Sequence, residues 1–516
     1  MNPLIPAPLL QQLLQSSERQ VAAFHTPGHK RGAGCLEQLK QAWGMDVLQA
    51  DLPELVELDN LFAPTGVIHQ AQVQAAETFG ADRTWFTTNG STAGVIAAIL
   101  ATCGPGDRIL LPRNMHLSAI SGLILSGAEP ILITPPYDSD WDLVGTITPK
   151  TIATALAAYP DIKAVLIVSP TYHGICADTE AIASICHAHG IPLLVDEAHG
   201  AHFGFHPALP QRALALSADL SVQSTHKVLS ALTQAAMVHV KGDRVNPDRL
   251  QQALQLIQST SPSYLLLASL DAAQAQMAQD GERLMAETVS LAQSIRDRLQ
   301  AIPDLSVFTQ SVFAQSVLAQ QDLKLELKKL SPDPTRITVR TTGLGITGFT
   351  ADAQLDEQFG VVAELPSLQH LTFIVSLGNT KEDGDRLVAA WSHLAQQKTT
   401  PVEPALEQFK SLLQGTASAN TIPGASTPVH SQLRITPRTA FFGNHQDVAI
   451  EAAIGQVSAA TVCPYPPGIP VLLPGEEIRS EAIDWLMTLA NAGSTITGIT
   501  EPFGTLRIVR DNPASV

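Results

Sequence analysis

The sequence is poor in several residue types, and each shortage excludes a class of protein. Only 15% of the 516 residues are charged, whereas 45% are hydrophobic, which supports a large buried core and excludes a disordered chain. Lys and Arg number 31 and Asp and Glu number 48, a net charge of −17. We therefore expect no nucleic-acid partner, because such binders carry a basic surface.

Cysteines and long apolar runs are also scarce. The five cysteines are scattered and form no CxxC pair, so we expect neither a disulfide framework nor a zinc site, as suits a reducing cytoplasm. No Lys or Arg precedes Arg19, so the basic region of a signal peptide is missing. Runs such as GVIAAILATCG are shorter than the ~18 residues of a membrane span. The sequence thus predicts a cytoplasmic protein without a membrane partner.

Short apolar runs alternate with helix-like stretches between about residues 80 and 240. These runs are apolar on both faces and predict an α/β fold, a parallel sheet covered by helices on both sides. Ligands collect at the carboxyl ends of such strands, so the residues after each run are site candidates. The expected strands are Thr84–Thr88, Arg108–Leu111, Pro130–Ile133, Ala164–Val168, Ile191–Val195 and Leu220–Gln223.

The remainder of the chain divides into smaller parts. A helical pattern over Ser269–Ile302 predicts a connecting helix, and the strand-like segments after it predict a small α+β domain. A stretch rich in Pro, Ser and Thr predicts a linker. The expected domains are 1–268 (large domain), 269–398 (connecting helix and small α+β domain), 399–431 (linker) and 432–516 (a third, C-terminal α+β unit).

The first motif with chemical meaning is FTTNGSTAG, where a predicted strand meets a predicted helix. Gly90 allows a tight turn, and Ser91 and Thr92 offer hydroxyl groups at the start of the helix. One interpretation is an ordinary helix cap. The other is a phosphate site, because free N–H groups at a helix N-terminus bind anions.

The second motif is IPLLVDEAHGAH, in which Asp196 and Glu197 end a predicted buried strand. A nucleotide hydrolase would also need a GxxxxGK[ST] loop, which the sequence lacks. A metal site at His199 and His202 would lack a third ligand. A third interpretation is a carboxylate that faces the protonated ring nitrogen of a cofactor, and this motif alone does not decide among the three.

The third motif is ADLSVQSTHKVLS, in which Lys227 follows a predicted strand of the same sheet. Most lysines are solvated, but a lysine at this place, beside Ser224 and His226, is also where a Schiff-base lysine would lie. A phosphate cradle, a carboxylate and a reactive lysine together fit pyridoxal phosphate. His116, after another strand, adds a flat group that could stack on the ring.

With these motifs in place, the chain resembles the ornithine/lysine/arginine decarboxylase family of fold-type-I pyridoxal-phosphate enzymes, whose large domain is like that of aspartate aminotransferase. The resemblance spans nearly the whole chain. Its TPGHK motif starts at Thr26, which leaves no room for the N-terminal response-regulator-like domain of the long members and implies the short form. The matching segments are FHTPGHKRG, ELDNLFAPTG, FGADRTWFTTNGSTAG, PRNMHLSAISGLILSGA, SPTYHGI, VDEAHGAHFGFH, QSTHKVLSALTQ, STSPSYLLLASLD, DPTRITV and PYPPGIPVLLPGE.

The resemblance implies a role for each residue of these motifs. Lys227 would attach the cofactor covalently, Asp196 would pair with the pyridine N–H, His116 would stack on the ring and His199 would support its Asp196 side. Thr260, in STSPS, would reach the cofactor of a neighbouring subunit, since these sites form at a dimer interface. The residues expected around the phosphate are Gly90, Ser91, Thr92, Ser224 and His226.

The reaction expected from the resemblance is decarboxylation of a basic amino acid, arginine or lysine rather than ornithine, to an amine of the polyamine type. An aminotransferase would need an arginine for the α-carboxylate, such as Arg336 or Arg340. A side-chain lyase and a cofactor-free regulatory relative are the other rivals. We expect Glu364 to hold the distal cation of the substrate; the alternative is the acidic stretch at 46–59.

Overall fold

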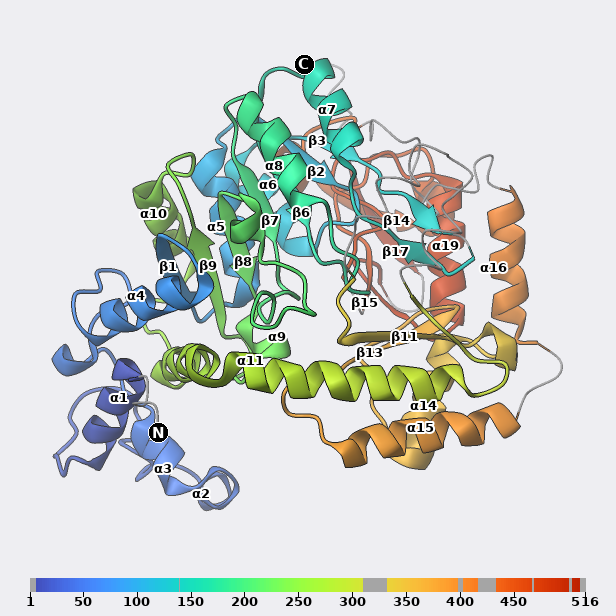
Figure 1. Cartoon of the computed structure of the whole chain (residues 1–516). Coiled ribbons are helices and arrows are strands. Elements are labelled where there is room, and N and C mark those ends of the chain that lie inside the picture. The colour runs from blue at the N-terminus through green and yellow to red at the C-terminus, as the bar shows by residue number, and fades with distance from the viewer. Residues whose placement is uncertain are drawn as a thin grey trace. The chain divides into compact units, whose positions relative to one another are not determined.

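The computed structural model describes residues 6–138, 140–309, 332–397, 402–415, 433–465, 468–500 and 504–510 (Figure 1). Its contacts divide the chain into two compact units, which are described one at a time. The first unit comprises Met1–Thr102, Leu194–Pro207 and Gln211–Ala286, and the second comprises Cys103–Leu193, Ala208–Pro210 and Glu287–Val516. Each unit is made of segments that are far apart in the sequence, whereas each predicted domain is one continuous stretch. The predicted domain borders therefore stay predictions.

Four strands form the sheet of the first unit, in the order β1 (Arg83–Thr87), β9 (Ala236–Val240), β8 (Leu220–Gln223) and β7 (Leu193–Asp196). β7 and β8 are parallel, whereas β9 is antiparallel to both β8 and β1. The predictions of β1, β7 and β8 are confirmed, and β9 is a strand that we did not predict. Because β1, β7 and β8 run the same way, their carboxyl ends meet at one edge.

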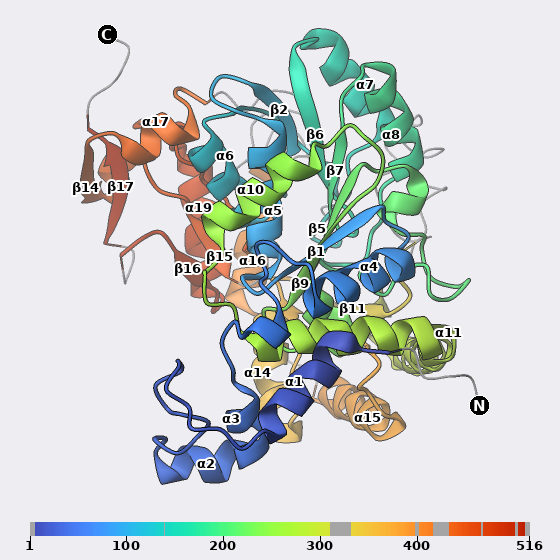
Figure 2. The same cartoon turned by 90° about the vertical axis from the view of Figure 1, so that its left-hand side faces the viewer.

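Helix α5 (Gly90–Thr102) packs closely on this sheet. A Cβ atom added to Gly94 would lie 2.5 Å from Val222 Cγ1 and 2.8 Å from Val238 Cγ2, so only glycine fits there. α10 (Pro247–Ile257) lies beside α5 (Figure 2). The other helices of this unit are α1 (Pro8–Glu18), α2 (Glu37–Trp43), α3 (Met45–Ala50), α4 (Val67–Phe79), α9 (Thr225–Val228) and the first part of α11 (Tyr264–Gln300).

The second unit begins with a parallel sheet in the order β6 (Ile162–Val168), β2 (Arg108–Pro112) and β3 (Glu129–Ile133). These three strands confirm the apolar runs predicted in this part of the chain. Helices α6 (Leu117–Ser126), α7 (Pro149–Ala158) and α8 (Thr179–Ala188) alternate with them, and a short hairpin joins β4 (Tyr137–Asp138) to β5 (Leu143–Val144).

The predicted small α+β region is a four-stranded antiparallel sheet in the second unit. Its order is β10 (Ser306–Val307), β11 (Arg336–Arg340), β13 (His370–Ile374) and β12 (Leu365–Pro366). Helices α14 (Gly348–Phe359) and α15 (Lys381–Gln396) and the end of α11 supply its core, in which Trp391 is fully buried. The predicted connecting helix at 269–302 corresponds to α11.

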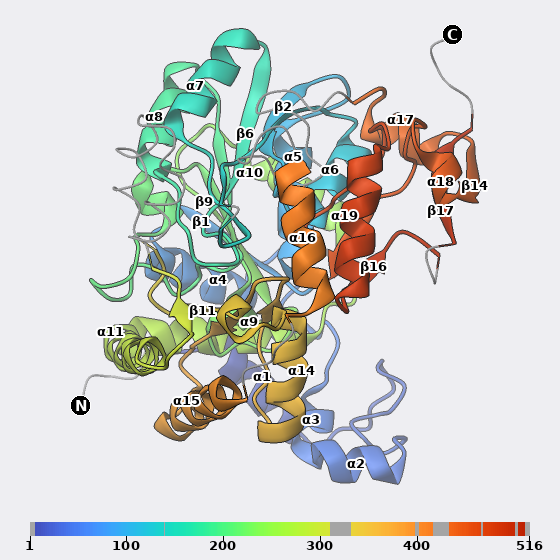
Figure 3. The same ribbon diagram turned by 90° about the vertical axis from the view of Figure 1, so that its right-hand side faces the viewer.

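The last part of the second unit has its own apolar core around Trp485 and Phe409. Within the predicted linker at 399–431, α16 (Pro404–Gly415) lies beside α19 (Ser480–Asn491) (Figure 3), and the rest of that stretch is mostly outside the described residues. No described helix is long and apolar enough to cross a membrane. The other elements are α17 (Pro437–Phe442), β14 (His445–Ala449), α18 (Ile450–Ala453), β15 (Cys463–Tyr465), β16 (Thr495–Thr497) and β17 (Thr505–Val509).

A polar network is buried inside the sheet of the first unit. His239 on β9 lies between Thr84, whose Oγ1 is 2.8 Å from Nδ1, and Gln223, whose Oε1 is 3.2 Å from Nε2. The Gln223 amide donates to Glu197 Oε2 at 2.8 Å. Burial, assisted by Arg212, lowers the pKa of His239 to about 3. His239 therefore stays neutral in the folded protein.

This network makes the protein less stable in mild acid. The unfolded chain binds a proton at His239 near pH 6.5 and the folded protein does so only near pH 3, so stability is lost as the pH falls below 6.5. Between pH 7 and pH 5 this one group lowers the free energy of unfolding by about 2 kcal/mol. We expect His239→Gln to reduce this pH dependence in urea unfolding curves, and His189→Gln, at an exposed site, to leave it unchanged. An identical pH dependence in His239→Gln would contradict the assignment.

Candidate active site

The carboxyl end of β1 leads into the N-terminus of α5. Gly90 has a φ of +73°, a left-handed conformation that glycine adopts without strain, and it turns the chain so that Ser91 and Thr92 lie in the first helical turn. Ser224, at the end of β8, donates a hydrogen bond from its Oγ to Ser91 Oγ at 2.7 Å. The structure thus brings two hydroxyl groups from distant motifs to one helix N-terminus, where backbone N–H groups favour an anion.

Two acidic side chains end β7, and they have different surroundings. Asp196 is 6% exposed, and its Oδ1 accepts a hydrogen bond from the Ala198 N–H at 3.2 Å. Glu197 is 2% exposed and accepts from the Ala213 N–H at 2.8 Å, Ser221 Oγ at 2.6 Å and Gln223 Nε2. Burial raises the pKa of Glu197, and these donors oppose the rise. The donors around Glu197 hold it in the interior, whereas Asp196 lies at the sheet edge.

Lys227 lies on α9, directly after β8. Its Nζ is 3.0 Å from His199 Nε2, which links the turn after β7 to the turn after β8. Next to it, His226 Nδ1 is 3.0 Å from the Ala235 carbonyl oxygen. Burial lowers the pKa of His226, a hydrogen bond to Ala235 raises it and the nearby Lys227 lowers it further. The structure therefore brings Lys227 and His199 together, a contact that we did not predict from the motifs.

His116 belongs to the second unit, where it caps α6. Its Nδ1 accepts from the Ser118 N–H at 3.1 Å and contacts Ser118 Oγ at 2.9 Å. Its Nε2 edge faces Gly468 of the PYPPGIP motif, where an added Cβ would lie 3.5 Å from Nε2. The ring is thus held between its own helix and the backbone of the C-terminal region.

Arg113, three residues before His116, holds this C-terminal region in place and was missed in the sequence. It is 7% exposed and donates to the Pro470 carbonyl at 2.9 Å, the Val471 carbonyl at 2.7 Å and Glu476 Oε2 at 2.9 Å. Burial raises the pKa of Glu476, and Arg113 opposes the rise. No local pattern marks this pair, because its members are 363 residues apart.

The two candidates for binding a distal cation lie in different units. Glu364 is exposed, contrary to our expectation of a buried charge, because it precedes the short strand β12. Burial lowers the pKa of the Arg336 guanidinium, and Asp333 and Glu364 lie near enough to oppose that fall. In the acidic stretch, most side chains already have partners: Asp59 accepts N–H bonds at the start of α4, Asp51 pairs with His29 at 3.0 Å, and Glu57 pairs with Arg19.

The residues of the first unit fit pyridoxal phosphate. The hydroxyl pair at the α5 N-terminus suits its phosphate, Asp196 suits its ring nitrogen, and Lys227 suits its aldehyde carbon. All three groups follow strands that point the same way, so they share one edge of the sheet. Among the described residues, no cluster of three His, Cys, Asp or Glu side chains is arranged to hold a metal ion.

Comparison with known proteins identifies the family. The model of the Orn/Lys/Arg decarboxylase major domain matches residues 7–383, and that of the Orn/Lys/Arg decarboxylase C-terminal domain matches residues 422–507. The chain belongs to this family. Pyridoxal phosphate is accordingly its cofactor, and decarboxylation of a basic amino acid is its reaction.

Relatives of this decarboxylase support both its family and its fold. Arginine decarboxylase of Bacillus subtilis (strain 168) is 37% identical over 503 residues, which cover 98% of this chain and 97% of the relative. The crystal structure of the Francisella novicida lysine decarboxylase superimposes with a TM-score of 0.81 at 25% identity, covering 97% of this chain and 80% of that one. An alanine–glyoxylate aminotransferase from Nostoc sp., at 17% identity and a TM-score of 0.51, covers 65% of this chain and 88% of that one. The expected fold-type-I architecture is confirmed.

The contact between the Ser91 and Ser224 hydroxyl groups leads to a prediction about cofactor binding. We expect Ser91→Ala and Ser224→Ala each to weaken binding of pyridoxal phosphate by about 10- to 100-fold, because a hydrogen bond to a charged group contributes ~1.5–3 kcal/mol. Absorbance titration of the cofactor-free protein measures this. Ser230→Ala, at an exposed serine that contacts Gln276, is the matched control. Equal affinity in all three variants would exclude this phosphate site.

Proposed function

We propose that this family member is an arginine decarboxylase that releases carbon dioxide and agmatine. The observation that carries the choice of arginine is the similarity along nearly its full length to an arginine decarboxylase, at 37% identity, against 25% for the lysine decarboxylase of known structure. Lysine stays the second candidate, because arginine and lysine present similar cations on similar chains and a pocket separates such substrates by only ~1–3 kcal/mol.

The proposed roles follow from the placement of each side chain. The bound cofactor supplies an electron sink for the bond to the leaving carboxylate. Lys227 holds the cofactor covalently and carries on Nζ the proton that is delivered to the substrate carbon. Asp196 would keep a proton on the ring nitrogen through a charge-assisted hydrogen bond. His199, in contact with Lys227 Nζ, positions this amine, and we assign His116 to the ring face.

The remaining proposed contacts orient the cofactor. Ser91, Thr92, Ser224 and His226 surround the phosphate, and Gly90 lets the chain turn close to it. Fixing the phosphate and the ring nitrogen at two ends leaves the ring one orientation. The groups that hold the substrate against this fixed ring would then decide which substrate bond breaks, and that choice distinguishes decarboxylation from the aminotransferase and side-chain lyase reactions of the same fold.

A product assay tests the proposed reaction and substrate. We expect the holoenzyme to convert arginine to agmatine and carbon dioxide with a kcat/KM at least about tenfold above that for lysine or ornithine, which corresponds to ~1.4 kcal/mol. Lys227→Ala should form no product, and Lys241→Ala, at an exposed lysine, should be fully active. A predominance of cadaverine or putrescine overturns the choice of arginine, and a keto acid product overturns the reaction.

We further propose a homodimer, or a multiple of one, in which Thr260 reaches the partner's cofactor. Thr260 is exposed in the single chain. Large apolar side chains are also exposed in the first unit, including Phe24 at 94%, Val56 at 100% and Leu256 at 80%, and exposure of this kind marks interaction surfaces. Light scattering of the holoenzyme measures the assembly, and a fully active monomer would contradict it.

A cytoplasmic location is also part of the proposal. All five cysteines are free thiols, four of them buried. Free thiols persist in a reducing compartment, where disulfides are rare. Cell fractionation decides the location, and recovery outside the cytoplasmic fraction would exclude it.

Glu364 is the proposed partner of the distal cation of the substrate, and it needs the assembled enzyme to cover its exposed side chain. We expect Glu364→Gln to raise KM for the amino acid by about tenfold or more, because a charge pair in an interface is worth ~1.5 kcal/mol or more. The absorbance of the bound cofactor should not change. Glu382→Gln, at an exposed position on α15, is the control. An unchanged KM would transfer the role to Glu57 or Asp59.

A further inference from the structure

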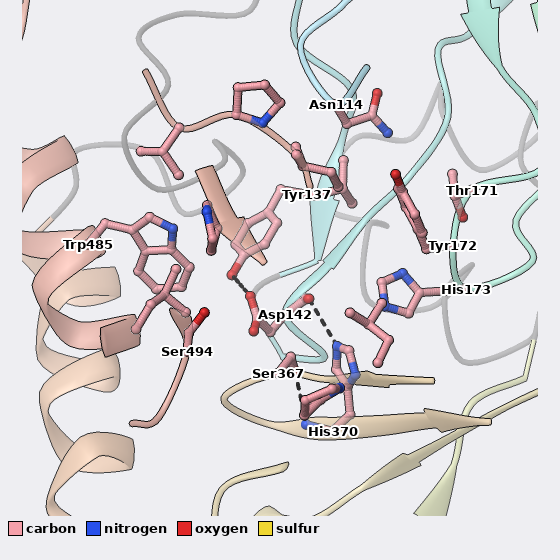
Figure 4. Close-up of a pocket in the computed structure, with 18 of the residues that line it drawn as sticks. Asn114, Tyr137, Asp142, Thr171, Tyr172, His173, Ser367, His370, Trp485 and Ser494 are labelled. Atoms are coloured by element: carbon pink, nitrogen blue, oxygen red, sulfur yellow. Dashed lines mark hydrogen bonds between the residues drawn. The ribbon is translucent and has the colours of Figure 1, made fainter. Parts of the chain in front are cut away.

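The second unit contains a cavity of about 150 Å³ to which the proposed function assigns no role (Figure 4). Cavities of about this volume in other proteins accept a ligand the size of benzene. The residues that line it are mostly apolar. They come from the segments that follow β2 and β6, from the β4–β5 hairpin, from the small antiparallel sheet and from the C-terminal region. Four aromatic side chains line it: Tyr137, Tyr172, Phe349 and Trp485.

A carboxylate lies among these rings. Asp142, in the turn of the β4–β5 hairpin, accepts a hydrogen bond from the Tyr137 hydroxyl at 2.8 Å, and Figure 4 shows this pair between Trp485 on one side and Tyr172 on the other. Asp142 has a φ of +53°, which costs an L-residue energy. Burial raises the pKa of Asp142 to about 7, hydrogen bonds to Tyr137 and Ser367 lower it, and Asp138 raises it. None of these groups carries a positive charge.

None of the other ionisable groups of the described lining provides a cation that pairs with the Asp142 carboxylate. Arg113 is engaged with two carbonyl groups and Glu476. Burial lowers the pKa of His370 to about 4 and that of His173 well below its usual value, so both rings are neutral at pH 7. His370 Nε2 donates to the Asp142 carbonyl oxygen at 3.2 Å, not to its carboxylate.

Three polar atoms of the lining also have no hydrogen-bond partner among the described residues. They are Ser494 Oγ, His370 Nδ1 and His173 Nε2; Ser494 is 8% exposed and His370 is 1% exposed. Unpaired buried polar atoms are costly, and they are usually satisfied by a ligand or by water. The cavity therefore offers a carboxylate, aromatic faces and further acceptor atoms, a combination that suits a positively charged ligand.

We propose that this cavity binds a small aliphatic cation, a primary ammonium or guanidinium group on a short alkyl chain. The cation pairs with Asp142, the rings of Trp485 and Tyr172 stabilise it by cation–π interaction, and the alkyl chain covers Phe349 and Leu489. With a pKa of about 7, the Asp142 carboxyl group is half ionised at neutral pH, and a bound cation favours the ionised form. A neutral ligand would gain no ion pair, and an anion would be repelled by the ionised form. The ligand class follows from the cavity alone; regulation of the enzyme by its own amine product rests additionally on the proposed function.

Binding is tested on the holoenzyme after borohydride reduction, which closes the catalytic lysine to new ligands. Agmatine, cadaverine and putrescine are titrated by calorimetry, with n-butanol as a neutral probe. We expect saturable binding of the amines and none of n-butanol. Asp142→Asn should remove one binding site per chain, and Asp140→Asn, at an exposed aspartate of the same hairpin, should keep it. Equal binding by Asp142→Asn, or equal binding of n-butanol, overturns the proposal.

A second pair of variants covers the case in which Asp142→Asn fails to fold. Trp485→Leu removes the aromatic face and should weaken binding several-fold, whereas Trp485→Phe should largely restore it. Equal affinity in the leucine variant would overturn the proposal independently of Asp142. Heats of binding do not depend on turnover, so the two proposals can fail separately. Amine binding without decarboxylation would refute only the proposed function. Decarboxylation without amine binding would refute only the proposed amine site in the cavity.

Steady-state kinetics test the regulatory role. We expect agmatine to inhibit the wild type with a non-competitive component that Asp142→Asn removes while kcat and KM stay unchanged. A rise of KM in Asp142→Asn would make the cavity part of the substrate site and overturn a separate site. Purely competitive inhibition of the wild type would exclude regulation through it.

Discussion

The hydrogen bonds of Glu197 determine how the sheet edge of the first unit is built. A carboxylate in the interior is unfavourable unless donors surround it, and Glu197 obtains them from the Ala213 backbone and from Ser221 and Gln223 on β8. This requirement fixes the end of β7 against β8. Asp196 precedes this anchor by one residue, and Ser224 follows Gln223 directly. Asp196 and Ser224 consequently have defined positions, because the neighbouring residues Glu197 and Gln223 are held by their hydrogen bond to each other.

The sequence was most informative where a local pattern has a single physical explanation. Runs that are apolar on both faces are strands of a covered sheet, and β2, β3 and β6 lie where these runs predicted them. Glycine before two hydroxyl residues, at a strand end, correctly indicated the turn at Gly90. Neither result needed knowledge of distant contacts. The family resemblance supplied the reaction, which the motifs alone had left open between several pyridoxal-phosphate chemistries.

Features that depend on distant partners were not predictable in this way. β9 is an apolar run that we did not predict, and its antiparallel direction is seen only in its pairing with β1 and β8. Glu364 lies between apolar runs, yet the turn before β12 exposes it. The residues that line the cavity around Asp142 are spread along the chain from Arg113 to Ser494, so no short stretch of sequence could predict the cavity. The role of His239 likewise depends on Thr84 and Gln223, from two other strands.

The contacts of Arg113 make the major domain and the C-terminal region of this chain depend on each other. Its guanidinium is anchored at the end of β2, within the major domain, but all three of its hydrogen-bond partners lie beyond residue 469. Without the C-terminal region, this guanidinium would lose its ion pair and both carbonyl acceptors at once. Another C-terminal region could replace it in this chain only if it brought a glutamate and two carbonyl groups to the same positions. The two domains of the family are thus joined here by one buried cation and its three acceptors.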